Sequence, residues 1–96
     1  MKITRHAKKR TKERCGNSSD RTAAIAFEKG LKHSECVGAL SKYAYYLYCH
    51  NKRANNIRFY GNYVYIFCDT TLITVITLPS AHKKAVDKLM ARKNAE

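Results

Sequence analysis

The hydrophobic and polar positions of this 96-residue chain change their period near residue 50, from a helical pattern to a strand pattern. The clearest helical signal is a row of residues spaced by three and four positions: Leu40, Tyr43, Ala44, Leu47 and Tyr48. From residue 57 onward, β-branched and aromatic residues dominate, which is typical of strands. Helices are therefore expected to precede a sheet.

Two shorter helices are expected before residue 40. Residues 4–14 contain neither Gly nor Pro, and their sparse buried positions recur every four residues, with Gly16 as the stop. A second helix has several candidate caps among residues 17–20 and ends at Gly30. The thin stripe of the first helix consists of Ile3, Ala7 and Thr11. Residues 32–38 are expected to form a connection.

Three strands are expected in the second half, over residues 57–60, 63–68 and 72–78. Gly61 and Asn62 form a two-residue hairpin signal between the first two, because Gly adopts the positive φ that such turns require. The middle strand carries apolar residues on both faces, so it is expected to be central. One face holds Val64, Ile66 and Cys68, and the other holds Tyr63, Tyr65 and Phe67.

Pro79 ends the last strand, and an amphipathic helix is expected to follow over about residues 80–93. The sequence therefore predicts one α+β domain over residues 1–96. It has helices over about residues 4–50, a three-stranded antiparallel meander over about residues 57–78, and a C-terminal helix.

The charge of the chain indicates what kind of partner it binds. Lys and Arg total 19 against 7 Asp and Glu, a formal net charge of +12 that calls for an anionic partner. No charge-free run reaches the roughly 18 apolar residues of a membrane span. The basic N-terminus is followed by no apolar stretch, so a cytoplasmic protein without a membrane partner is expected.

The four cysteines give no metal signature. Cys15, Cys36, Cys49 and Cys68 form no CxxC pair and have no His-x3-His partner, so zinc spacing is absent. In a reducing cytosol they are expected to be free thiols. No metal or other cofactor is expected from this sequence.

The first helix carries the sharpest chemical feature. His6, Arg10 and Arg14 are spaced by four residues and therefore share one helix face. Guanidinium groups bind phosphate oxygens bidentately, and an imidazole can move a proton to or from a ribose 2′-hydroxyl. Further cations extend this face: Arg5, Lys8, Lys9 and Lys12. Three readings stay open, namely a solvated face, phosphate binding without catalysis, and metal-independent cleavage of RNA.

A second basic set lies between the third helix and the first strand. It comprises Lys52, Arg53, Asn56 and Arg58, followed by Tyr60, with Asn55 beside them. Amides, cations and an aromatic ring in this arrangement suit an unstacked base and its backbone, although a solvated turn explains the amides equally well. Tyr46 and Tyr60 are the candidates for base stacking.

Residues 6–16 read HAKKRTKERCG. This segment resembles the HAxxRxxER opening, followed by Gly, of small bacterial and phage domains in the BECR superfamily, which groups barnase, EndoU, colicin and RelE-like proteins. It is most similar to uncharacterised RelE-like proteins of mobile elements. The order of helices followed by an antiparallel meander is similar as well, so a RelE-like fold is expected.

The resemblance implies an RNA-directed protein, in many cases a toxin that cleaves RNA without a metal. By position it assigns His6, Arg10 and Arg14 as the catalytic residues. Cys15 adds a residue before Gly16, and the strand at residues 72–78 ends without the Arg or Tyr of many RelE-like toxins. The leading expectation is therefore a small RNA-binding protein. The alternatives are a metal-independent endoribonuclease toxin and a phage or mobile-element protein that binds an acidic protein such as an antitoxin.

Overall fold

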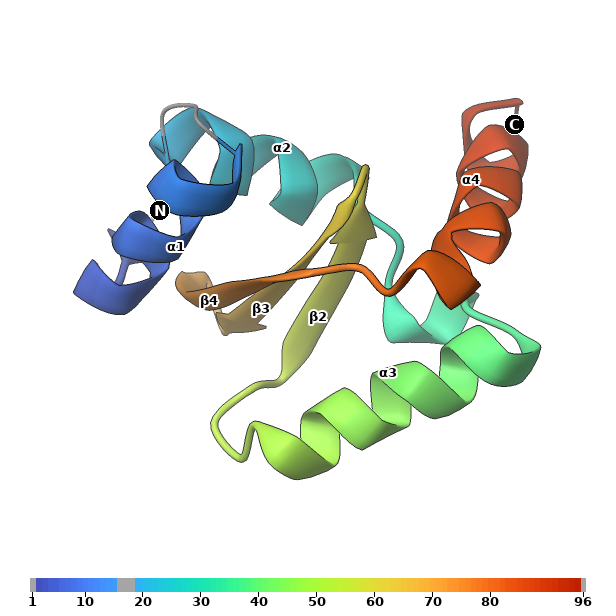
Figure 1. Ribbon diagram of the computed structural model, residues 1–96, viewed down its shortest axis with the longest axis horizontal. Helices are drawn as coiled ribbons and strands as arrows, with labels where there is room; N and C mark the ends of the chain where they lie inside the picture. The colour runs from blue at the N-terminus through green and yellow to red at the C-terminus, as the bar shows by residue number, and fades with distance from the viewer. Residues whose placement is uncertain (1, 16–18, 96) are drawn as a thin grey trace.

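The computed structural model describes residues 2–15 and 19–95, with the backbone alone for residues 14, 15, 19, 20 and 95. Helices and strands follow one another as shown in Figure 1. In order they are β1 (Lys2–Ile3), α1 (Arg5–Cys15), α2 (Ser19–Lys29), the 3-10 helix η1 (His33–Glu35), α3 (Gly38–His50), β2 (Asn56–Tyr60), β3 (Tyr63–Cys68), β4 (Thr71–Thr77) and α4 (Ser80–Ala95). The expected α+β class is confirmed. The stop at Gly16 and the cap candidates Asn17 and Ser18 lie outside the described residues.

The sheet has four strands in the order β1-β4-β3-β2. β2, β3 and β4 pair antiparallel, whereas β1 pairs parallel with β4 through Lys2–Thr71 and Ile3–Leu72. The expected sheet of three antiparallel strands is therefore corrected to a four-stranded mixed sheet. A two-residue strand is too short to show the alternation from which strands are predicted.

The register of the sheet follows from one turn and one bulge. Gly61 has φ +62°, which allows the tight turn that pairs Tyr60 with Tyr63, as the hairpin signal predicts. Between β3 and β4 the pairing shifts at Ile66 and Phe67, so that Ile73 is the extra residue of a bulge. This bulge lies at the point where β1 stops pairing with β4.

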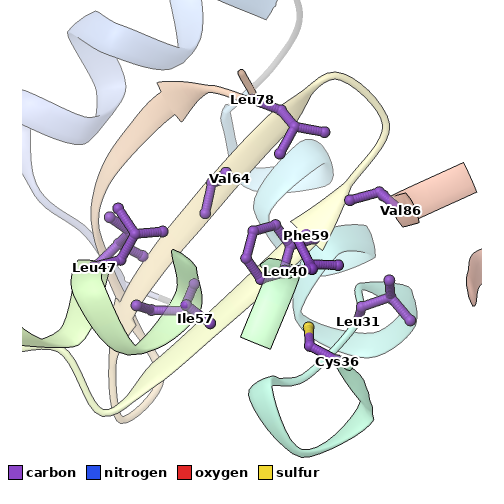
Figure 2. Close-up of a cluster of buried hydrophobic side chains, with 11 residues drawn as sticks. Leu31, Cys36, Leu40, Leu47, Ile57, Phe59, Val64, Leu78 and Val86 are labelled. Carbon is purple, nitrogen blue, oxygen red and sulfur yellow. The ribbon is translucent and has the colours of Figure 1, made fainter. Parts of the chain in front are cut away.

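Helices cover both faces of the sheet, α1 and α2 on one side and α3 on the other (Figure 1). On the α3 side, buried residues of α3, β2, β3 and α4 form one core, which Figure 2 shows. On the other side, alanines of α1 and α2 pack on Tyr65 and Phe67. Val64 and Ile66 belong to the first core, so the predicted two-sided burial of the middle strand is confirmed.

Gly30 ends α2, as the sequence predicts, at a crowded position. Its amide donates to the carbonyl oxygen of Ala26, and an added Cβ would lie 2.5 Å from that oxygen and 2.8 Å from the Cβ of Arg58. The carbonyl oxygen of Gly30 accepts hydrogen bonds from Arg58 and from Lys93 of α4. This junction therefore ties α2, β2 and α4 together. None of the described helices combines the length and apolar character needed to cross a bilayer.

Candidate nucleic-acid interface

Helix α1 is held against β4 by small and polar residues rather than by a broad apolar face. Ala7 and Thr11 are fully buried, and the hydroxyl of Thr11 donates to the carbonyl oxygen of Ala7 at 2.8 Å. Thr4 caps the helix, because its hydroxyl oxygen accepts from the amide of Ala7 at 3.1 Å. The same hydroxyl donates to the carbonyl oxygen of Ile73 at 3.2 Å. Thr4 therefore fixes where α1 begins relative to β4.

The remaining faces of α1 carry the predicted cations. Four of them are exposed: Arg5, Lys8, Lys9 and Lys12. His6 is exposed and Arg10 is partly buried. Among the described residues α1 makes one ion pair, between Arg10 and Glu13 at 4.0 Å, with both side chains over 40% exposed. A pair this long and this exposed neutralises little charge. The side chain of Arg14, the third residue of the predicted row, lies outside the described residues.

His6 and Arg10 line a hollow of about 420 Å³ beside β4. Residues 73–76 form its floor, and Asn51, which follows the last residue of α3, lines it from the other side of the sheet. Figure 1 shows α1 and the C-terminal end of α3 on opposite sides of β4. The hollow arises here because β1 pairs only as far as Leu72, so the edge of β4 that faces away from β3 has no strand of the described chain beside it at these residues.

A second hollow of about 370 Å³ shares Ile73 with the first. It is lined by Lys2 of β1, by Arg53 of the turn after α3, and by residues 68–71 at the β3–β4 turn. We call the two hollows together the β4 groove. Cations from three separate segments of the chain, Lys2, Arg10 and Arg53, therefore line two adjoining hollows along β4, with His6 beside Arg10.

Asp69 is the acid that lines the groove among the described residues. Its carboxylate accepts a hydrogen bond from the side-chain nitrogen of Asn55 at 2.8 Å. Its backbone N–H donates to the side-chain oxygen of Asn55 at 2.7 Å. Asp69 also has φ +55°, a left-handed conformation that Asp tolerates in turns. Asn55 therefore closes the β3–β4 turn against the start of β2, so turn geometry accounts for this residue.

Arg58 does not belong to the surface. It is 7% exposed, its Nε donates to Asn56 at 2.9 Å and a terminal nitrogen donates to the carbonyl oxygen of Gly30 at 3.1 Å. Its guanidinium lies 5.4 Å from the ring centroid of Phe27, and burial lowers its pKa. Arg58 and its acceptor Asn56 serve the fold, so we leave both out of the interface.

Tyr60 is also separated from the groove. It lies at the end of β2 farthest from Lys52 and Arg53, where it is half-buried and packs against the core on the α2 side. Together with Tyr63, Tyr65 and residues of α2 it lines a different hollow of about 320 Å³. Of the second predicted set, the structure thus brings Arg53 to the β4 groove, whereas Lys52 stands exposed beside it in the same turn.

Sequence reasoning missed Lys2 and Asn51 as lining residues. Lys2 belongs to a strand of two residues, which is too short to predict from sequence. Asn51 has the sequence context of the first residue of a polar turn. The side-chain nitrogen of Asn51 donates to the carbonyl oxygen of Leu47 at 2.8 Å, which fixes its orientation at the end of α3. No local sequence signal places either residue beside β4, because Lys2 comes there through the pairing of β1 with β4 and Asn51 through the position of the end of α3.

Comparisons with protein-family models, curated proteins and solved structures give no match. The RelE-like resemblance therefore stays a prediction from the sequence. The chemistry of the β4 groove must be argued from its own residues.

Proposed function

We propose that this protein binds RNA and holds its phosphate backbone in the β4 groove. The observation that supports this most is that His6 and Arg10 line one hollow along β4 and Arg53 lines the next, with Ile73 in both, although 43 positions separate Arg10 from Arg53. Clustered cations with few neighbouring acids favour a polyanion, since phosphate binding is dominated by charge. The choice of RNA over DNA follows from the RelE-like resemblance of residues 6–16.

Loss of the groove cations is expected to weaken binding to a short single-stranded RNA. The double variant Arg10→Gln/Arg53→Gln should lose about tenfold or more in affinity, because each charge-assisted hydrogen bond contributes about 1.5 kcal/mol or more. Fluorescence anisotropy with a labelled oligonucleotide measures this. A matched control is Lys84→Gln/Lys88→Gln, which removes two exposed cations from α4 at the other end of the molecule. Equal losses in both variants would contradict a localised site.

A metal-independent ribonuclease is the second candidate, favoured because His6 and Arg10 line the same hollow. In such a reaction the 2′-oxygen attacks phosphorus, the bond to the 5′-oxygen breaks, and the products are a 2′,3′-cyclic phosphate and a 5′-hydroxyl. His6 would accept the 2′-hydroxyl proton, Arg10 would neutralise the developing phosphorane charge, and water would give a proton to the departing 5′-oxygen. The anisotropy samples, analysed on a gel, distinguish the candidates. Cleavage that survives EDTA and disappears in His6→Ala supports the enzyme, whereas intact RNA leaves binding alone.

A further inference from the structure

A row of aromatic and histidine rings runs along one flank of α3. Tyr43, Tyr46 and His50 occupy successive turns, with ring centroids 6.3 Å apart for Tyr43–Tyr46 and 4.1 Å apart for Tyr46–His50. His82 of α4 stacks on Tyr43 at 4.7 Å and an angle of 18°. We call Tyr43, Tyr46, His50 and His82 the ring row. It contains half of the histidines in the chain.

The ring row is anchored at one end and open at the other. Tyr43 is half-buried against Phe59, with a centroid distance of 6.2 Å, and burial raises the pKa of its phenol. Tyr46 is 54% exposed and His50 is exposed as well. Large aromatic side chains exposed together on a helix commonly mark a contact surface. The open end of the row thus exposes the ring of His50 and the part of the Tyr46 ring that Tyr43 and His50 leave uncovered.

The ring row lies on the same side of α3 as the β4 groove. On the opposite flank, the hydroxyl of Tyr48 accepts from the amide of Ile57, which belongs to β2 at the far edge of the sheet. Tyr43, by contrast, stacks on His82, the third residue of α4, and α4 begins directly after Pro79. The flank that carries Tyr43, Tyr46 and His50 is therefore opposite Tyr48, on the side of α3 where β4 leads through Pro79 into α4.

The open end of the row also adjoins the groove along the chain. His50 is the last residue of α3 and precedes Asn51, a lining residue of the groove. At 1.5 Å per residue, Tyr46 lies about 7.5 Å from Asn51 along the helix axis. Lys52 and Arg53 follow Asn51 directly, so two cations lie just beyond the ring row along the chain. Side chains of these two kinds match the phosphates and the bases of one strand.

We propose that Tyr46 and His50 stack the unpaired bases of a single-stranded RNA whose phosphates lie in the β4 groove. The inference rests on the proposed function and specifies its ligand, because bases paired in a duplex are stacked on one another and present no free face. Stacking is tolerant of sequence, since every base has a π face. Single-stranded RNA is therefore preferred over duplex, with little dependence on base identity.

Replacing the ring of Tyr46 tests this directly. In Tyr46→Leu the affinity for a short oligouridylate should fall about fivefold or more, because stacking of one base on an aromatic side chain is typically worth that much. Tyr46→Phe keeps the ring and should bind as the wild type does. The matched control is Tyr45→Leu, since Tyr45 is 65% exposed on the neighbouring helix position and lies outside the ring row. Circular dichroism of each variant checks that α3 is intact.

A blunt RNA duplex of the same length separates this inference from the proposed function. Support requires that wild-type protein binds the single strand more tightly and that Tyr46→Leu removes most of this preference. If the wild type binds both RNAs with salt-sensitive affinity but without preference, or if Tyr45→Leu and Tyr46→Leu lose affinity equally, the ring row is not the base platform and the groove proposal stands. If the wild type binds neither RNA, both proposals fail.

Discussion

Arg58 places a guanidinium inside the protein, where its donors depend on acceptors from the same chain. Asn56 and the carbonyl oxygen of Gly30 supply them, and Phe27 lies against the cation. Because burial disfavours the charged form, these contacts must compensate the lost hydration of the cation. A residue that would be an RNA ligand on a surface therefore acts as a link between β2 and the end of α2.

Arg58→Met is expected to lower the free energy of unfolding by about 2 kcal/mol, since it removes charged hydrogen bonds to buried acceptors while roughly keeping the side-chain volume. Urea unfolding followed by circular dichroism measures this loss. Arg53→Met, in the exposed turn, serves as the control and should leave stability unchanged while weakening RNA binding. A variant at Arg58 that unfolds like the wild type but no longer binds RNA would return this residue to the interface.

The sequence predicts an RNA-binding face at Arg58 because amides, cations and an aromatic ring occur together where the polar turn leads into the strand. The structure covers that face with α2, whose Phe27 reaches Arg58. Ala7 and Thr11 were read correctly as the buried stripe of the first helix, since a spacing of four fixes a common face without knowledge of the partner. A local sequence pattern does not identify the residue of another element that a side chain will contact.

At the scale of elements, the β4 groove is a consequence of a strand pairing that stops early. β1 pairs with β4 at two positions, and Thr4 then turns the chain into α1 with bonds to Leu72 and Ile73. The bulge at Ile73 lies at the same point, where the twist of β4 changes. Beyond Leu72, side chains of α1 and of the α3–β2 turn line the hollow along β4.

The helices and the three longer strands were predictable because the pattern of hydrophobic and polar residues in each continues over five residues or more. The short elements were not: β1 has two residues, and η1 lies in a segment expected to be a plain connection. Of the candidate site, the basic face of α1 followed from spacing alone. Its meeting with Arg53 depends on tertiary packing, so the sequence offered two separate sets where the structure has one groove.

The connection between α2 and α3 is fixed by Glu35. Its carboxylate accepts from the amide of Lys32 at 2.9 Å and pairs with Lys93 of α4 at 3.0 Å. The hydrogen bond from Lys32 is the largest cause of the lowered pKa of Glu35, and Lys93 adds to it. A carboxyl group whose pKa is lower in the folded state stabilises the fold above its unfolded pKa, and this contribution is lost as pH falls through the folded pKa.

Glu35→Gln is therefore expected to be less stable than the wild type at neutral pH, by under about 1 kcal/mol because the pair is partly exposed. Below the usual carboxyl range the difference between the two proteins should vanish, since Glu35 is then protonated. Thermal unfolding at several pH values measures it. Glu28→Gln, at an exposed position of α2, is the control and should show a smaller effect. A difference that persists unchanged at acid pH would mean that charge is not its cause.

At the level of the whole molecule, the cations behind the net charge of +12 differ in how they are paired. Lys83 and Lys93 of α4 bind backbone oxygens and the acids Asp87 and Glu35. On α1, the described ion pair is the loose contact between Arg10 and Glu13. The exposed cations of α1 adjoin the β4 groove, whereas Lys84 and Lys88 stand exposed on α4 at the other end of the molecule (Figure 1).

The salt dependence of RNA binding tests the central claim most directly. Each phosphate neutralised on a single strand contributes about −0.7 to the slope of log K against log salt concentration, so a groove that contacts three phosphates gives about −2. We expect a wild-type slope at least that steep, and a slope shallower by about 1.4 in Arg10→Gln/Arg53→Gln. Binding that is insensitive to salt, or a slope that the double variant leaves unchanged, would contradict the account.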